Sequence, residues 1–228
     1  QQMVSLQQFF KTVYRCYTAY QKVYHSGTIL FTNILQHKLN LKEVVINPRT
    51  LLLPISLGII ALVVILVPSV SQDPEYHNFK DHRNILGIPH FWNVVTNLPF
   101  ILLGIIGFFK IQKRDLTGIL PDLFIAYLTL FMGLVLTGLG SAYYHLNPSN
   151  STLVGDRMAI TITFMSFFVL IYGESISTKT ASKLLVPLIF LGLASVVYWN
   201  ITENLGIGDL RFYSLVQFLP MLLIPLML

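Results

Sequence analysis

Long apolar runs separated by short polar stretches are the most regular feature of the chain. Six of them are candidate membrane-spanning helices, near 51–70, 92–109, 123–145, 153–173, 183–200 and 209–228. A helix needs roughly 20 residues to cross the hydrocarbon core of a bilayer. Because the runs are continuous and do not alternate apolar with polar residues, they favour helices over strands. The pattern predicts an all-α fold, a polytopic transmembrane bundle of about six spanning helices.

Composition supports an integral, multi-pass membrane protein. The 228 residues are 54% hydrophobic and 11% charged, with a mean hydropathy of +0.66. Soluble domains carry about 25% charged residues, so the deficit here is large. The single cysteine, Cys16, excludes a disulfide within the chain.

Charge and periodicity divide the chain into a basic N-terminal segment, 1–50, and a transmembrane domain, 51–228. The first segment holds six Lys/Arg and one acid, which accounts for the whole formal charge of +5. Its apolar residues recur at spacings of three and four, which is typical of an amphipathic helix lying on the bilayer surface. A poorly ordered or packed leader without a binding role is the alternative. No basic globular domain accompanies the segment, so we expect a bilayer partner and no nucleic acid.

Loop charges predict the orientation of the chain. With the N-terminus in the cytoplasm, the inner segments hold eleven Lys/Arg and the outer loops hold four. The positive-inside rule therefore favours a cytoplasmic N-terminus. Ser141 and Asp156 then both lie toward the outer face.

Three side chains of the types that take part in catalysis or metal binding lie at consecutive helix ends: Ser141, His145 and Asp156. Residues four apart share a helix face, and the turn at 147–150 makes the next helix antiparallel and adjacent. Ionisable groups at membrane depth are costly, and they are functional candidates for that reason. The alternatives are a hydroxyl bonded to backbone, an interfacial histidine, and a surface pair of Asp156 with Arg157 favoured by the helix dipole.

The segments Gly140-Ser-Ala-Tyr-Tyr-His145 and Gly155-Asp-Arg-Met158 resemble the Ser-x-x-x-His and Asp signature of the alkaline ceramidase family. Phe91-Trp-Asn-Val-Val-Thr-Asn97 resembles the start of the first core helix of that family. The similarity covers roughly 73–228. The family belongs to a superfamily of seven-helix membrane hydrolases that includes adiponectin receptors. The resemblance implies a seven-helix core, to which the run at 51–70 adds one helix at the N-terminal side.

The resemblance also implies an activity and a metal. Ceramidases of this kind hydrolyse the amide of ceramide-like sphingolipids, releasing a fatty acid and a sphingoid base, at a zinc ion held by three histidines. Carried over, His145 is a zinc ligand, Ser141 steadies the oxyanion or the metal-bound water, and Asp156 orients water or moves protons. Zinc lowers the pKa of bound water toward ~7, which suits amide hydrolysis.

One part of the family pattern is missing from the sequence. The family carries a His-x-x-x-His pair on its last helix, and no histidine follows His145. We expect the native chain to continue into a further helix that bears this pair. The alternative is a non-catalytic lipid-binding or receptor-like protein that has lost the metal site. A transporter is a weaker alternative, because no inverted repeat is visible.

The polar loop 71–91 is a second candidate metal region. It contains three acids and three histidines: Asp73, Glu75, Asp81, His77, His82 and His90. Some family members bind calcium with an acidic loop at this place, but His90 stands where an acid is expected. Calcium prefers oxygen ligands, so this site is doubtful. His77 and His82 are either metal ligands or, as we favour, solvated loop residues.

Overall fold

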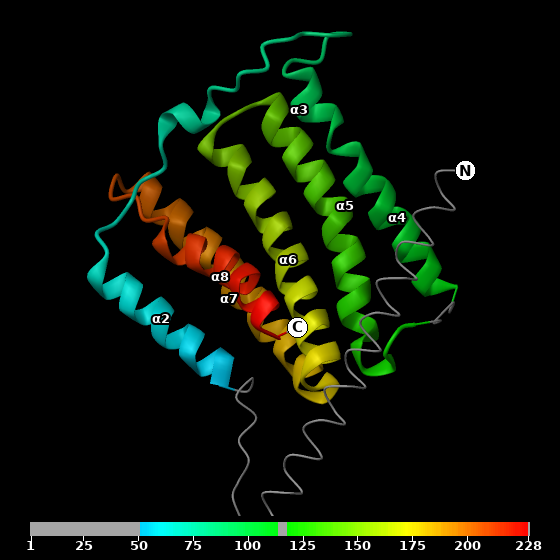
Figure 1. Ribbon diagram of the computed structural model, residues 1–228. Helices are drawn as coiled ribbons and strands as arrows, with labels where there is room; N and C mark the ends of the chain where they lie inside the picture. Colours follow the sequence, from blue (N-terminus) through cyan, green and yellow to red (C-terminus); the bar gives the residue numbers. More distant parts are fainter. Residues whose placement is uncertain (1–50, 114–117, 228) are drawn as a thin grey trace, which may run out of the picture. The chain divides into compact units, whose positions relative to one another are not determined.

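The computed structural model describes residues 51–113 and 118–227, which form α-helices joined by loops (Figure 1). The α-helices are α2 (Leu52–Leu66), α3 (Phe91–Val95), α4 (Leu98–Gln112), α5 (Phe124–Leu146), α6 (Asn150–Ser175), α7 (Thr178–Asn204) and α8 (Arg211–Met227). Short 3-10 helices, η2 (Pro74–His77) and η3 (Pro121–Leu123), precede α3 and α5. In these residues β-pairing is confined to one isolated bridge. The predicted all-α fold is confirmed, and the basic segment 1–50 lies outside the described residues.

The predicted helices occur at the expected places, but two are shorter than predicted. In the run 51–70, α2 has 15 residues, and in the run 209–228, α8 has 17. Pro68 accounts for the end of α2, because a residue that precedes proline disfavours the helical conformation. Val67 accordingly adopts an extended backbone, with φ −93° and ψ 131°.

Four helices of the described part are long and apolar enough to cross a bilayer: Phe91–Gln112, Pro121–Leu146, Asn150–Ser175 and Thr178–Asn204. The first of them includes both α3 and α4. Large apolar side chains of α4, such as Leu102, Leu103 and Ile106, are more than half exposed. Exposed apolar surface of this extent is unusual for a soluble monomer and is compatible with a location in lipid.

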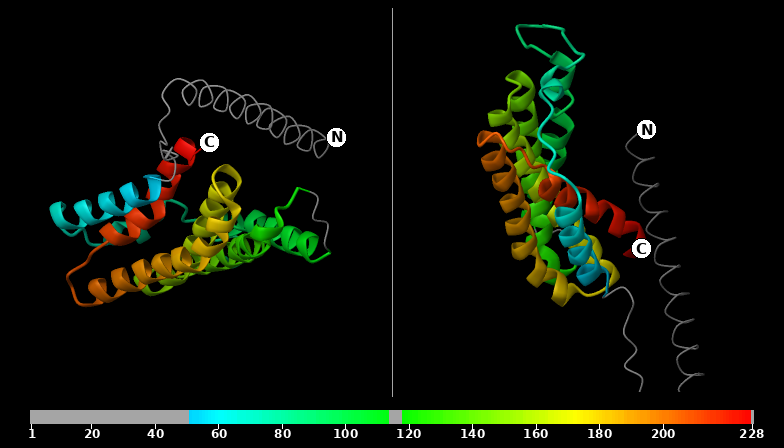
Figure 2. Two further views of the ribbon diagram at one scale, coloured as in Figure 1. Left: turned by 90° about the horizontal axis from the view of Figure 1, so that it is seen from below. Right: turned by 90° about the vertical axis from the view of Figure 1, so that its left-hand side faces the viewer.

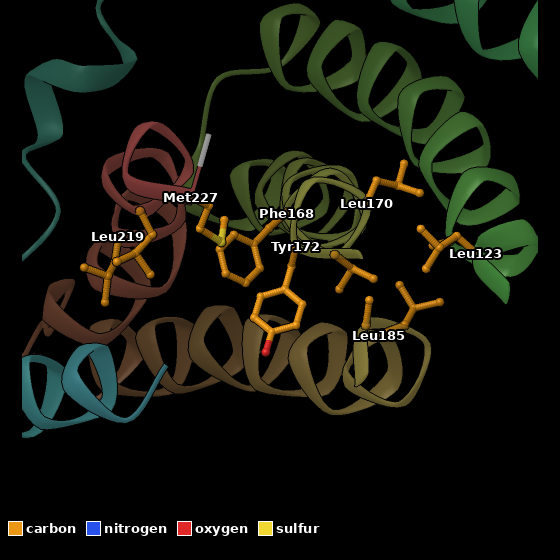
Figure 3. Close-up of a cluster of buried hydrophobic side chains, with 11 residues drawn as sticks. Leu123, Phe168, Leu170, Tyr172, Leu185, Leu219 and Met227 are labelled. Atoms are coloured by element: carbon orange, nitrogen blue, oxygen red, sulfur yellow. The ribbon is translucent and has the colours of Figure 1, made fainter. Parts of the chain in front are cut away.

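The central helix of the bundle is α6, which packs against α5, α7 and α8, while α4 packs on the far side of α5 (Figures 1 and 2). The short helix α2 contacts α8. Toward the C-terminal end of α6, apolar side chains from α5 to α8 form the main core, among them Phe168, Tyr172, Leu185 and Leu219 (Figure 3).

A second, smaller core lies at the N-terminal end of α6. It is built from Tyr144 of α5, Leu153 of α6, Val196 and Trp199 of α7, and Tyr213 of α8. Because three of these five side chains are aromatic, the cluster combines apolar surface with hydroxyl and indole groups. The N-terminal end of α6 therefore packs in an environment that is rigid and partly polar.

Asp209 ties the end of α7 to the start of α8. Its carboxylate accepts hydrogen bonds from Tyr198 Oη at 2.9 Å, Arg211 Nε at 2.8 Å and Arg211 Nη2 at 2.6 Å. Another nitrogen of Arg211, Nη1, donates to the carbonyl of Val67, just beyond α2. The network therefore joins the ends of three helices around one nearly buried carboxylate.

This network predicts a loss of stability in acid. The hydrogen bonds from Arg211 are the main reason that the pKa of Asp209 falls from 3.8 to about 2. A lowered pKa stabilises the fold above the unfolded-state pKa, and that contribution is lost as the pH falls through the folded-state pKa. Asp209→Asn should therefore lower the thermal unfolding midpoint at neutral pH, and it should flatten the pH dependence between pH 4 and pH 2.

Thermal unfolding of the detergent-solubilised protein over this pH range measures the effect. Asp122→Asn is the matched control, because Asp122 is an exposed acid whose carboxylate accepts one hydrogen bond, from Thr178. An Asp209→Asn variant with the same slope as the wild type between pH 4 and pH 2 would contradict this interpretation.

Candidate functional site

The helices α5 and α6 approach each other closely beside Ser141 and Asp156. A Cβ atom placed on Gly140 would lie 3.2 Å from the carbonyl oxygen of Gly155 and 3.4 Å from the Cα of Asp156. Small residues allow such close helix contacts. As a result, the Ser141 side chain lies near the Asp156 carboxylate, although no hydrogen bond joins Ser141 to the Oδ1 atom. Two of the three side chains that were expected to approach one point, Ser141 and Asp156, thus lie near each other, and their roles remain a prediction.

The start of α6 fixes the position of Asp156. Ser149 caps the helix by accepting a hydrogen bond from the Thr152 backbone at 3.3 Å. A capped start holds the first turns in register, because it satisfies backbone donors that would otherwise lack partners. Asp156 follows in the second turn, where it is 7% exposed, and its Oδ1 has no hydrogen-bond partner. A buried acceptor without a partner is costly, and this one is a candidate to receive a substrate or water proton.

His145 lies one turn beyond Ser141 on α5, under the loop that precedes α3. Its ring is tilted against the ring of Phe79, with 4.6 Å between the ring centroids, and the ring centroid of Tyr144 is 5.2 Å away. The Nδ1 atom is buried and has no hydrogen-bond partner. The nitrogen therefore lacks a partner among the described residues, and the imidazole makes no hydrogen bond that joins it to Ser141 or Asp156.

His77 holds the preceding loop against this end of the bundle. Its Nδ1 lies 2.9 Å from the hydroxyl of Tyr144, and its Nε2 lies 2.9 Å from Oδ1 of Asn150. Since an amide oxygen only accepts, Nε2 donates, and a neutral His77 then accepts from Tyr144 at Nδ1. The expectation that His77 is a solvated loop residue is wrong, because the histidine joins α5 to α6. His82 is exposed, as expected for a solvated loop residue.

Arg157 is buried within a cage of aromatic rings. Its guanidinium carbon lies 4.0 Å from the centre of the Trp199 ring, 4.6 Å from Tyr213 and 6.0 Å from Tyr76. Nη2 donates to the side-chain oxygen of Gln72 at 2.6 Å. Nη1 is buried and has no hydrogen-bond partner. The alternative of a surface pair between Asp156 and Arg157 is therefore wrong, since both side chains lie inside the protein.

A cavity of about 220 Å³ opens beside this arginine. Its walls include Asp156 and Arg157 of α6, together with Tyr213, Ser214 and Gln217 of α8. Water occupies about 30 Å³ per molecule in the liquid, so the space holds a group several times larger than water. The cavity thus places two buried groups of opposite charge beside a volume suited to a small polar group.

Metal donors are sparse in the part of the chain that the structure describes. No three His, Cys, Asp or Glu side chains lie together there as a metal site. In the loop proposed for calcium, Asp73 accepts from the backbone of Glu75 at 2.9 Å, and Asp81 accepts from the backbone of Trp92 at 2.8 Å. These two carboxylates serve to cap short helices. The described residues therefore do not hold a catalytic zinc by themselves, since such an ion takes three protein ligands.

The close contact at Gly140 leads to a prediction with a matched control. In Gly140→Ala, the new methyl group must push the α6 backbone away by a few tenths of an ångström, because its nearest neighbour is a carbonyl oxygen. This shift separates Ser141 from Asp156, and small misplacements of reacting groups are expensive in rate. For the amide hydrolysis that the sequence resemblance implies, we expect kcat/KM to fall about threefold to tenfold.

Gly155→Ala is the control, because a Cβ atom there meets nothing within 4 Å. An alanine in open space on a helix stabilises by up to about 1 kcal/mol relative to glycine. We therefore expect unchanged kcat/KM and an equal or higher unfolding midpoint. Equal activity of the two variants would show that the spacing of α5 and α6 does not matter for the reaction.

Comparison with protein families gives a direct assignment. The family model described as Ceramidase matches residues 80–227, which is well over half of the chain. No curated protein and no solved structure matches the chain significantly. The matched residues include α3 to α8, with the juxtaposed Ser141 and Asp156, and they leave out α2 and η2. The chain therefore belongs to the ceramidase family.

Proposed function

We propose that this protein is a membrane-embedded hydrolase that cleaves the amide bond of ceramide-like sphingolipids into a fatty acid and a sphingoid base. Membership of the ceramidase family indicates hydrolysis of a ceramide amide. We place the reaction beside Asp156, and the observation that supports this is the close approach of α5 and α6 at Gly140, which brings Ser141 near the buried carboxylate of Asp156. Both residues lie beside a close contact of α5 and α6.

Hydrolysis of an amide requires three steps, which these side chains can promote. A water oxygen forms a bond to the amide carbonyl carbon, the C–N bond breaks, and the nitrogen gains a proton. We assign the proton transfers to Asp156, whose Oδ1 has no other partner. Ser141 steadies the oxyanion or the attacking water. Proton transfer by a positioned side chain typically contributes a factor of about 10² to 10⁴ in rate.

Zinc is the proposed cofactor, and His145 is the residue that we propose as one of its ligands. The buried and unpartnered Nδ1 of His145 is a suitable donor. When bound, a zinc ion would activate water for attack on the carbonyl. Two further protein ligands would have to come from residues outside those that the structure describes. Calcium in the loop 71–91 has no comparable support.

A location in the bilayer suits a lipid with two hydrocarbon chains. Four long apolar helices provide the membrane span, and the site lies close to their ends, at the C-terminal end of α5 and the N-terminal end of α6. A polar headgroup can therefore reach Asp156 while its chains stay in lipid. We retain a cytoplasmic N-terminus as part of the proposal, on the distribution of Lys and Arg between the loops.

The test is an assay of fatty-acid release from ceramide by the purified full-length protein, combined with elemental analysis for zinc. We expect release by the wild type, and loss of both release and bound zinc in His145→Ala. Release that survives His145→Ala and exhaustive chelation would contradict the zinc proposal. Binding of ceramide without any release would contradict the hydrolase and favour a non-catalytic lipid-binding protein.

A further inference from the structure

The loop before α3 contains a tight apolar hairpin that the proposed reaction does not use. The backbone N–H groups of Ile85 and Ile88 each donate to the carbonyl oxygen of the other, at 3.2 Å and 3.0 Å. The two central residues, Leu86 and Gly87, have positive φ angles of 55° and 79°. A two-residue turn with two positive φ angles is of the kind that favours Asn-Gly. Leucine is strained there, because its Cβ atom lies too close to the following carbonyl oxygen.

The strain at Leu86 is not offset by burial of its side chain. Leu86 is 92% exposed, the highest value among the exposed large apolar side chains in the part of the chain that the structure describes. Its neighbour Ile85 is 38% exposed. Asparagine would suit both the turn and water better. A strained backbone marks a place to look for function, and a leucine here indicates an apolar partner outside the described residues.

The hairpin lies close to the expected surface of the bilayer. Leu86 precedes the first long apolar helix, Phe91–Gln112, by five residues, and the loop lies beyond the N-terminal end of α3 (Figure 1). Five residues reach roughly 18 Å at most. Trp92, in the first turn of that helix, is 49% exposed, and tryptophan is enriched at the level of lipid headgroups. The apolar partner within reach of Leu86 is therefore lipid.

Basic side chains surround a polar cavity next to the hairpin. The cavity has a volume of about 610 Å³, and its walls include the exposed Lys80, His82 and Arg83. Asp81 is the acid among the lining residues, but its side chain is only 11% exposed, and its carboxylate accepts two backbone hydrogen bonds, at 2.8 Å and 3.3 Å. The accessible charge is therefore mainly positive. Lys and Arg bind phosphate oxygens through charge-assisted hydrogen bonds.

We propose that this loop docks on the bilayer surface, with Leu86 and Ile85 inserted at the boundary of the acyl chains and with Lys80 and Arg83 bound to the phosphate of a phospholipid headgroup. The apolar tip and the basic cavity are adjacent in one loop, as the headgroup phosphate and the acyl chains are adjacent in one lipid. The inference rests on the membrane location in the proposed function and is independent of the hydrolysis.

Docking also fixes the position of an aromatic side chain beside the candidate site. Phe79 lines the basic cavity. Its ring centroid lies 4.6 Å from that of His145 and 5.2 Å from that of His90. A loop held by lipid on its outer side therefore keeps Phe79 over His145. The phospholipid is thus a ligand that binds next to the site without entering it.

The experiment measures the depth of the hairpin in a bilayer. Cys16 is the single cysteine, so a Cys16→Ser background allows one nitroxide label at Asn84→Cys, an exposed position beside the turn. The full-length protein is placed in bilayers that contain phosphatidylglycerol. Relaxation of the label by oxygen, which concentrates in lipid, is compared with relaxation by a water-soluble nickel complex. We expect the label to be relaxed by oxygen and protected from nickel.

Substitution of Leu86 separates docking from folding. Leu86→Asn gives the turn its favoured Asn-Gly sequence, so the hairpin should form at least as well. The ratio of protected to unprotected label should nevertheless fall about tenfold or more, because the insertion of a leucine side chain into lipid is lost.

A second pair of variants tests the phosphate contact. Lys80→Gln with Arg83→Gln should lower the ratio about fivefold for each charge removed, since each basic side chain near an anionic surface contributes to binding. Lys110→Gln with Lys113→Gln is the matched control, because both lysines are exposed at the other end of α4. This control should leave the ratio at position 84 unchanged.

Nickel relaxation that is as strong in the presence of Leu86 as in Leu86→Asn would overturn the inference. Equal protection in bilayers of digalactosyldiacylglycerol, a lipid without phosphate, would overturn the phosphate contact. A second label at Ile106→Cys, on the lipid-facing surface of α4 where Ile106 is 58% exposed, separates the inference from the membrane location. Protection at position 106 without protection at position 84 contradicts docking alone, whereas nickel access to both positions contradicts the proposed membrane location as well.

Discussion

Asp156→Asn is expected to lower kcat/KM for ceramide hydrolysis about a hundredfold or more without unfolding the protein. Asparagine has nearly the same shape as aspartate, so it can still interact with Ser141 across the contact of α5 and α6. It cannot take a proton from water, and general-base catalysis contributes about 10² to 10⁴ in rate. Fatty-acid release and thermal unfolding, measured on the same preparation, separate catalysis from stability.

Glu174→Gln is the matched control for this prediction. Glu174 is an exposed acid near the opposite end of α6, and its carboxylate accepts a hydrogen bond from Tyr127 at 2.7 Å. The variant removes one negative charge from the same helix while leaving the site intact. Its kcat/KM should stay within about twofold of the wild type. Comparable losses in both variants would mean that the effect arises from net charge on α6.

The largest effect on stability is expected for Trp199→Ala. Trp199 is completely buried in the smaller core, and one face of its ring covers the guanidinium of Arg157. Removal of a buried tryptophan side chain costs about 3–5 kcal/mol through lost contacts and the cavity left behind. The cation–π contact adds to this loss, because Arg157 would remain buried with less compensation. The thermal unfolding midpoint should therefore fall steeply.

The chain offers its own control, since its other tryptophan, Trp92, is 49% exposed. Trp92→Ala should change the free energy of unfolding by about 1 kcal/mol or less, as for most exposed positions. A similar destabilisation by the two substitutions would show that the smaller core does not support this end of the bundle.

Periodicity and hydropathy predicted the helices well, and the reason is physical. A run of apolar residues between polar turns has few alternatives to a helix in an apolar surrounding, where backbone groups must bond within the segment. The early end of α2 could also have been deduced, because Pro68 forces Val67 out of the helical conformation. The contact of α2 with α8 could not have been deduced, because the two helices are far apart in the sequence.

The proximity of Ser141 and Asp156 was predictable, because the two residues are close in the sequence. Only a short turn separates α5 from α6, so the facing ends of two antiparallel helices had to be neighbours. The role of His145 remains a prediction. Its spacing from Ser141 is visible in the sequence, but the available Nδ1 atom depends on Phe79, which lies more than sixty residues earlier.

The sequence did not predict the burial of Arg157, because the residues that surround this side chain are distant from it in the chain. The sequence shows an acid followed by a base near a helix start, which is a common surface arrangement. The three aromatic rings of the cage and the acceptor Gln72 come from three separate parts of the chain. One signal was available, because a lone arginine inside a long apolar run needs partners within the protein. Which partners it finds depends on tertiary packing.

The most direct test of the central claim is a double-mutant cycle between Ser141→Ala and Asp156→Asn, scored by kcat/KM for ceramide hydrolysis. Residues that act as one unit are strongly non-additive, so the double variant should be little worse than Asp156→Asn alone. Losses that multiply, with both single variants folded and impaired, would mean that the two side chains act independently, and they would contradict a hydrolytic site built at the contact of α5 and α6.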